Sequence, residues 1–176
     1  MQSPVRPGTV ARREGLIFGA GLGILLCLNF LLGVYASFGF TVITWVVSFG
    51  VYFWAGMRAG KASHVTSAGL LAGLFTGVVS SVINLVVVLV VTLLDTTHLR
   101  IEAQKLADQV KNNTTHYTNS SYLSIVIFGL FFGIVLAALF GIGLGSAGGA
   151  IGRARAPLPT QPYEESMYQG VQPPQQ

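Results

Sequence analysis

Three long stretches of this sequence contain no Asp, Glu, Lys or Arg: residues 16–57, 62–94 and 117–152. A single charged side chain at the centre of a membrane helix costs about 2.5 to 3.5 kcal/mol on insertion scales. Only 9% of the 176 residues are charged, whereas soluble domains carry about 25%. A chain that avoids charge over such lengths is adapted to lipid. We therefore predict an integral membrane protein whose first partner is the lipid bilayer.

The first charge-free stretch is long enough for two helices, and it divides near residues 37–39, Ser-Phe-Gly. We predict an all-α membrane fold of four transmembrane helices in an antiparallel bundle, with no separate soluble domain. At about 1.5 Å per residue, each helix can cross a hydrocarbon core of about 30 Å. The predicted helices, which belong to a transmembrane domain of residues 15–152, are residues 16–36, 40–57, 68–94 and 122–151.

Basic residues flank the predicted helices unevenly, because seven of the ten Lys and Arg residues fall on one side of the membrane. These seven are Arg6, Arg12, Arg13, Arg58, Lys61, Arg153 and Arg155. By the positive-inside rule, both termini are cytoplasmic: a segment of residues 1–14 and a Pro-rich, disordered tail of residues 153–176. The 95–121 loop is then outside. The expected location is the cell membrane, with the bacterial inner membrane as the simplest case.

The N-terminus also imitates a cleaved signal peptide, since Arg12 and Arg13 precede an apolar run that ends in Val34-Tyr35-Ala36. The apolar region of a signal peptide has about 7 to 15 residues, and this run is longer and is followed at once by another apolar helix. We therefore favour a first helix that stays in the mature protein.

The 95–121 loop has apolar residues at helical spacing, Leu99, Ala103, Leu106 and Val110. Two interpretations remain open: an amphipathic helix that lies on the membrane or over the bundle, and a solvated connector with local helicity. The loop also holds three glycosylation patterns, which would matter only in a eukaryotic secretory pathway and which a polar linker produces by chance. They begin at Asn112, Asn113 and Asn119.

Small residues recur at every fourth position of the 122–151 helix. Such a stripe slants around the helix and matches the crossing of two helices whose backbones touch, as in GxxxG contacts. The 16–36 and 68–94 helices carry shorter stripes of the same kind. The expected helix-packing positions are Gly15, Gly19, Gly23, Gly69, Gly73, Gly77, Gly129, Gly133, Ala137, Gly141, Gly145 and Gly149.

A stripe of this length exceeds what one crossing helix can cover, because helices that cross at an angle separate after a few turns. We therefore expect the 122–151 helix to be central, with the 16–36 and 68–94 helices on its two sides. Gly56 and Gly60 would then stay exposed, as a contact for a weak homodimer or a helical membrane partner. The glycines concentrate in the cytoplasmic halves, which predicts a bundle that is tight there and wider outside.

The segments "GLIFGAGLG", "GLLAGLFTG" and "LGSAGGAIGR" resemble those of small bacterial four-helix integral membrane proteins with GxxxG-rich helices. The resemblance covers residues 15–153 and consists of glycine spacing and hydrophobicity. It implies the four-helix membrane fold and brings no activity, cofactor or site residue with it.

Asn29 and Asn84 are the amides that lie at membrane depth. Buried amides seek hydrogen-bond partners, so these two are expected either to bond each other or to line a small polar cavity. As an attachment between helices, such a contact is worth about 0.6 to 2 kcal/mol. The alternative is that the two amides line the path of a transported solute.

Patterns of catalytic or ligand sites are weak in this chain. Residues 143–148 match G-x-G-x-x-G, but no strand or βαβ unit surrounds them. The histidines are scattered and Cys27 is alone, so we expect no catalytic residue, no metal site, no cofactor and no intrachain disulfide. The basic residues lie at helix ends, where orientation explains them better than a nucleic-acid partner does.

Two functions follow from these features. The first is a multi-pass membrane protein with a structural or partner-binding role and no enzymatic activity. The second is a small channel or transporter for ions or small polar solutes.

Overall fold

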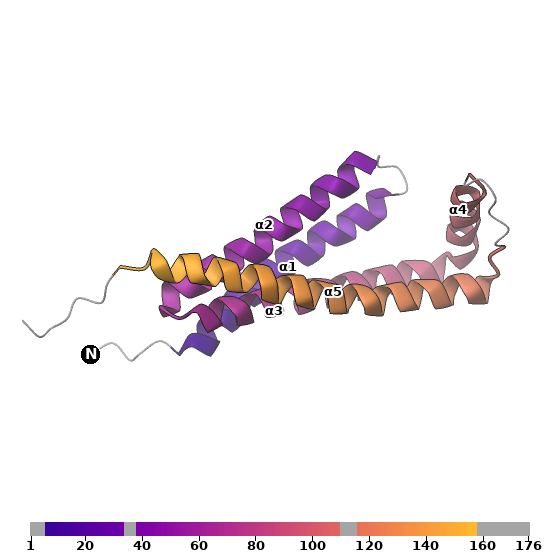
Figure 1. Cartoon of the computed structure of the whole chain (residues 1–176). Helices are drawn as coiled ribbons and strands as arrows, with labels where there is room; N and C mark the ends of the chain where they lie inside the picture. Colours follow the sequence, from indigo (N-terminus) through magenta and orange to yellow (C-terminus); the bar gives the residue numbers. More distant parts are fainter. Residues whose placement is uncertain (1–5, 34–37, 110–115, 158–176) are drawn as a thin grey trace, which may run out of the picture.

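The computed structural model describes residues 6–33, 38–109 and 116–157, and these residues form five helices and no strand (Figure 1). Four of the helices are long and apolar enough to cross a membrane, as a multi-pass membrane protein requires. In chain order the helices are α1 (Pro7–Gly33), α2 (Phe38–Ser63), α3 (Thr66–Leu94), α4 (Thr96–Asp108) and α5 (Asn119–Ala154), of which α4 is the short one.

The distribution of side chains is the reverse of that in a soluble protein. Most of the buried residues are small, and the cluster at one end consists of alanines that are 0% exposed. Large apolar side chains point outward instead: Phe128 is 73% exposed and Ile17 is 57% exposed. Lipid tails solvate such side chains, whereas water does not, so this surface suits the hydrocarbon core of a bilayer.

Each long helix begins before the residue that the hydropathy pattern predicts. α1 begins at Pro7 rather than at residue 16, since proline at the first helical position lacks only an N–H that would be unpaired there. α5 begins after Thr118, whose Oγ1 accepts a hydrogen bond from the Ser121 backbone N–H at 3.2 Å. In return, the Ser121 hydroxyl accepts from the Thr118 N–H at 2.8 Å, which completes a capping box.

A two-residue turn, His64 and Val65, joins α2 to α3. His64 adopts a left-handed conformation with φ 59°, which reverses the chain abruptly. We call this end of the molecule, where α1 begins and α5 also ends, the basic end. The opposite end, where α4 lies across the ends of α3 and α5 in Figure 1, is the α4 end.

The 95–121 loop contains a helix, α4 at Thr96–Asp108, which both interpretations of the loop allow. Two hydrogen bonds attach α4 to the residue that precedes the α5 cap: Arg100 Nη1 donates to the Tyr117 carbonyl at 2.9 Å, and Gln104 Oε1 accepts from the Tyr117 N–H at 2.8 Å. On the exposed face, Lys105 binds Glu102 at 2.7 Å and lowers the pKa of that carboxyl.

The glycosylation patterns fall at the end of this region. Asn119 is the first residue of α5. Asn112 and Asn113 lie outside the described residues, as does Val110 of the expected apolar face.

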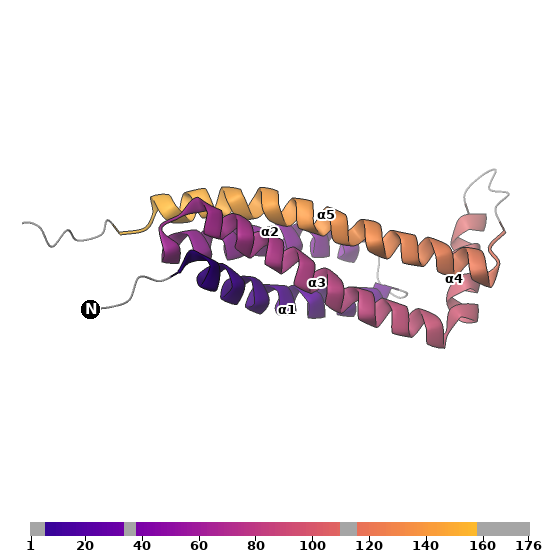
Figure 2. The same ribbon diagram turned by 90° about the horizontal axis from the view of Figure 1, so that it is seen from below.

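The length of its stripe predicted a central position for α5, but α2 and α3 are the two helices that contact all the other long helices. α3 packs against α1, α2 and α5, whereas α1 and α5 make no contact in the described part of the chain. Figure 2 shows α3 between α1 and α5. α5 does contact two long helices, but its second neighbour is α2, which occupies the side where α1 was expected.

The contact between α3 and α5 is made by backbone atoms. A Cβ atom added at Gly145 would lie 2.8 Å from Gly73 Cα and 2.7 Å from the Gly69 carbonyl oxygen, closer than real Cβ atoms come. Only glycine permits this approach. The pairs that meet are Gly69 with Gly149 and Gly145, Gly73 with Gly145 and Gly141, and Gly77 with Ala137, so the two helices run in opposite directions.

The same part of α5 also receives α2. Gly56 faces Gly145 and Gly60 faces Gly149, again through backbone atoms, and both α2 glycines are buried. The expectation that Gly56 and Gly60 form an exposed groove is therefore wrong. Glycine has no side chain to cover its own backbone, so one glycine-rich segment of α5 accepts neighbours on two sides at once.

The α1 glycines meet large side chains of α3, and Gly15 and Gly19 also meet the backbone carbonyls of Ala72 and Thr76. A Cβ added at Gly19 would lie 2.8 Å from Val79 Cβ, and one added at Gly23 would lie 2.9 Å from Ile83 Cβ. Gly15 faces the Phe75 side chain in the same way. The residue numbers of the contacts increase along both helices in the same direction, so α1 and α3 are parallel.

The glycine contacts make a specific prediction for stability. The variant Gly73→Ala places a methyl group against the Gly141 carbonyl oxygen and 2.8 Å from Gly145 Cα, and neither backbone can yield without separating the helices. We expect the free energy of unfolding in detergent and SDS mixtures to fall by about 1 to 3 kcal/mol. The matched control is Gly21→Ala, because no atom lies within 4 Å of a Cβ at Gly21. Equal stabilities of the two variants would contradict this packing.

Candidate functional site

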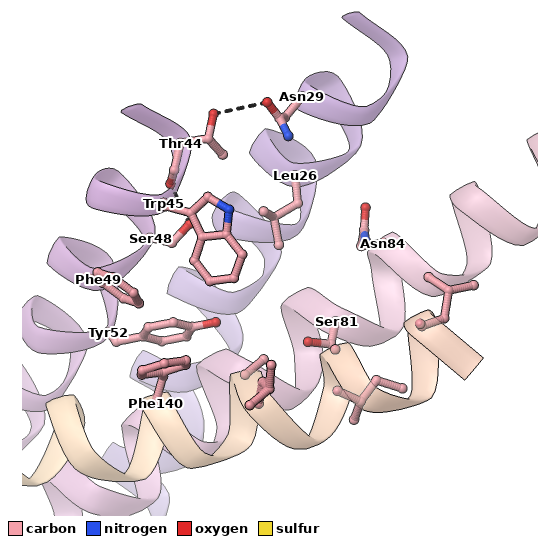
Figure 3. Close-up of a pocket in the computed structure, with 16 residues that line it drawn as sticks. Leu26, Asn29, Thr44, Trp45, Ser48, Phe49, Tyr52, Ser81, Asn84 and Phe140 are labelled. Carbon is pink, nitrogen blue, oxygen red and sulfur yellow. Dashed lines mark hydrogen bonds between the residues drawn. The ribbon is translucent and has the colours of Figure 1, made fainter. Parts of the chain in front are cut away.

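Toward the α4 end, α1 and α2 separate from α3 and α5, and a cavity of about 250 Å³ lies between these pairs (Figures 1 and 3). Most of its lining is apolar, and all four long helices contribute to it. We call it the amide cavity, because Asn29 and Asn84 both line it. The other polar side chains in its wall are Thr44, Ser48, Tyr52 and Ser81.

One side of the amide cavity is held together by hydrogen bonds. Thr44 Oγ1 of α2 donates to Asn29 Oδ1 of α1 at 3.3 Å, and the Ser48 hydroxyl donates to the Thr44 carbonyl at 2.7 Å (Figure 3). Thr44 and Ser48 are buried. The bond between Asn29 and Thr44 joins α1 to α2 at the level where these two helices are separated from α3 and α5.

Asn84 enters the cavity from α3, on the opposite side (Figure 3). Its Oδ1 atom is buried and has no hydrogen-bond partner in the described part of the chain. An unpaired buried acceptor costs about 1 to 3 kcal/mol. The structure thus places the two predicted amides on one cavity, where Asn29 is paired with Thr44 and Asn84 offers a free acceptor. A hydroxyl or amine donor that reached Asn84 would recover this energy.

Gly129 and Gly133 are corrections to the predicted packing stripe. No atom lies within 4 Å of a Cβ built at either residue, and both line the amide cavity. The reason lies in α3, which has no glycine after Gly77. Its larger side chains beyond that point hold α5 at a distance, so the glycines of the stripe nearer the α4 end find no backbone to contact.

Aromatic rings gather on the α2 side of the cavity (Figure 3). The ring centroids of Phe49 and Phe140 are 5.2 Å apart, and those of Trp45 and Phe49 are 5.9 Å apart. Tyr52 is buried and lies next to them. These rings join α2 to α5 at the side of the cavity nearer the basic end, next to the glycine contacts.

The α2 part of this wall was not predicted from the sequence. A signal was present, because Thr44, Ser48, Tyr52, Gly56 and Gly60 recur at every fourth residue and therefore share one helix face. The polar members of this face line the cavity, and its glycines contact α5.

The remaining sequence patterns do not assemble a site. No group of three metal-ligating side chains occurs among the residues that the structure describes. The G-x-G-x-x-G match, residues 143–148, lies inside α5, where Gly145 and Gly148 contact neighbouring helices and Gly143 contacts nothing. The match therefore belongs to helix packing.

No protein-family model, no curated protein and no solved structure matches this chain. Its function is therefore inferred from the cavity and the helix surfaces around it.

Proposed function

We propose that this protein is a non-catalytic, multi-pass component of the cell membrane that binds a transmembrane helix over the amide cavity. The observation that carries this proposal is the pair Gly129 and Gly133, a GxxxG motif with no neighbour. From Ala137 to Gly149, the four-residue positions of the same stripe are occupied by helices of this chain.

A helix that crossed α5 at Gly129 and Gly133 would gain dispersion contacts like those that Gly141, Gly145 and Gly149 make with neighbouring helices. The cavity below is too small for a helix, but about 250 Å³ accommodates side chains that such a helix projects inward. A donor among them would pair with the free Asn84 acceptor. The partner is a second copy of this chain or another helical membrane protein.

We also propose the orientation of the chain in the membrane. The four long helices form an antiparallel bundle with both termini in the cytoplasm, as the seven basic residues of the basic end favour. α4 then lies outside.

Cysteine accessibility tests this orientation. In a Cys27→Ser background, Gly8→Cys marks the basic end and His98→Cys marks α4, and both positions are exposed. We expect a membrane-impermeant maleimide added to intact cells to label His98→Cys, and to label Gly8→Cys only after the cells are opened. The reverse pattern would contradict the proposed topology.

Crosslinking tests the partner surface. In the Cys27→Ser background, we expect Gly133→Cys to give crosslinked products in native membranes, at twice the chain mass for a second copy or at another mass for a different protein. Gly143→Cys is the matched control, because Gly143 is an open position on the same helix that does not line the cavity. The variant Gly133→Leu should reduce association several-fold without loss of folding, since no atom lies within 4 Å of a Cβ built at Gly133 and the residue lines the cavity. Equal amounts of crosslinked product from Gly133→Cys and Gly143→Cys would contradict the proposal.

A small channel or transporter is the second candidate function, and the polar side chains that line part of the amide cavity favour it. In this case Asn29 and Asn84 line the solute path. We expect purified protein in liposomes to pass ions or small polar solutes faster than empty liposomes, and the Asn29→Leu/Asn84→Leu variant to lose most of this flux. Flux equal to that of empty liposomes, or unchanged in the variant, would leave partner binding as the better function.

A further inference from the structure

A second hollow lies at the basic end, where the side chains of α1, α2 and α5 form an open groove of about 650 Å³. It shares no residue with the amide cavity. We call it the basic groove, after the three cations in its wall, Arg58, Lys61 and Arg155. Glu14 is its one carboxylate, so the described wall carries a net charge of +2.

Arg58 is held in place by two contacts with α1. Its Nε atom lies 3.2 Å from Glu14 Oε2, and its guanidinium carbon lies 5.7 Å from the centroid of the Phe18 ring. The Glu14 side chain is only 11% exposed, whereas the Arg58 side chain is 58% exposed. The ion pair uses the Nε donor, and the Nη donors have no acceptor among the described residues. The guanidinium is therefore fixed and still able to bind an anion.

Lys61 and Arg155 supply the other cations. Lys61 is three residues after Arg58 on the same face of α2, and Arg155 follows α5. Both are exposed, and neither has an acidic partner in the part of the chain that the structure describes. α2 and α5 both end here, and their carbonyl ends repel anions, so binding depends on these cations.

The groove also has an apolar side. Trp54 lies one turn before Arg58 on α2, toward the membrane interior, and Met57 lines the groove beside it. Trp54 is 54% exposed. The groove therefore joins a cationic part at the end of the transmembrane helices to an apolar part that continues into the hydrocarbon region.

We propose that the basic groove binds the phosphate headgroup of an anionic phospholipid, with an acyl chain along Trp54. Arg58 offers paired donors that match the geometry of a phosphate, and Lys61 and Arg155 supply the net positive charge. The headgroup lies at the depth of helix ends, which is where these three side chains are. A free anion would satisfy the cations alone and leave the apolar side unused.

The test measures lipid binding to the full chain in detergent by native mass spectrometry. Phosphatidylglycerol, phosphatidylcholine and inorganic phosphate are the probes. We expect phosphatidylglycerol to bind at least about tenfold more tightly than phosphatidylcholine, and Lys61→Gln/Arg155→Gln to lose most of that preference. Arg58 is left intact because its removal would strand the buried Glu14 carboxylate.

The control is Arg13→Gln/Arg153→Gln, which removes the same charge from exposed positions of the basic end outside the groove. This variant should keep the preference for phosphatidylglycerol. Three outcomes would overturn the proposal: no preference in the natural protein, an equal loss in the control variant, or displacement of phosphatidylglycerol by an equal concentration of inorganic phosphate. The last would identify a site for free anions.

Discussion

The arrangement of the long helices depends on the contact of α5 backbone with α3 and α2 at Gly145 and Gly149. In lipid, the hydrophobic effect does not drive helices together, so close packing must supply the attraction. Glycine allows carbonyl oxygens and Cα atoms of one helix to lie directly on those of the next. Because Gly56 and Gly69 approach the same segment from two sides, one short stretch of α5 organises three helices.

The amide cavity follows from where this contact ends. α3 has no glycine after Gly77, and α5 therefore separates from it at Gly133 and Gly129. α1 stays with α2 through the bond between Asn29 and Thr44 and leaves Asn84 on the far wall. The tight and the open parts of the bundle are thus two results of one uneven distribution of glycine.

The two hollows differ in chemistry because they lie at different depths. The amide cavity is neutral and mostly apolar, and its wall carries one unpaired acceptor, Asn84 Oδ1. The basic groove lies at a helix end, where charge is tolerated, and the buried Glu14 carboxylate orients Arg58 there. The two proposed partners differ accordingly, a transmembrane helix for the amide cavity and a lipid headgroup for the basic groove, and neither proposal requires the other.

The sequence by itself determined the four helices that are long and apolar enough to cross a membrane, because a charge-free stretch that enters lipid must satisfy its backbone within one helix. It also determined which helix faces are bare, since a period of four residues lies along one face. Only the tertiary structure decided what each bare face meets. Gly19 meets the Val79 side chain, Gly73 meets Gly141, Gly60 meets Gly149, and Gly133 meets nothing. The spacing of the glycines in the sequence is alike in all four cases and does not indicate which neighbour each glycine meets. That neighbour depends on the size of the side chains on distant segments.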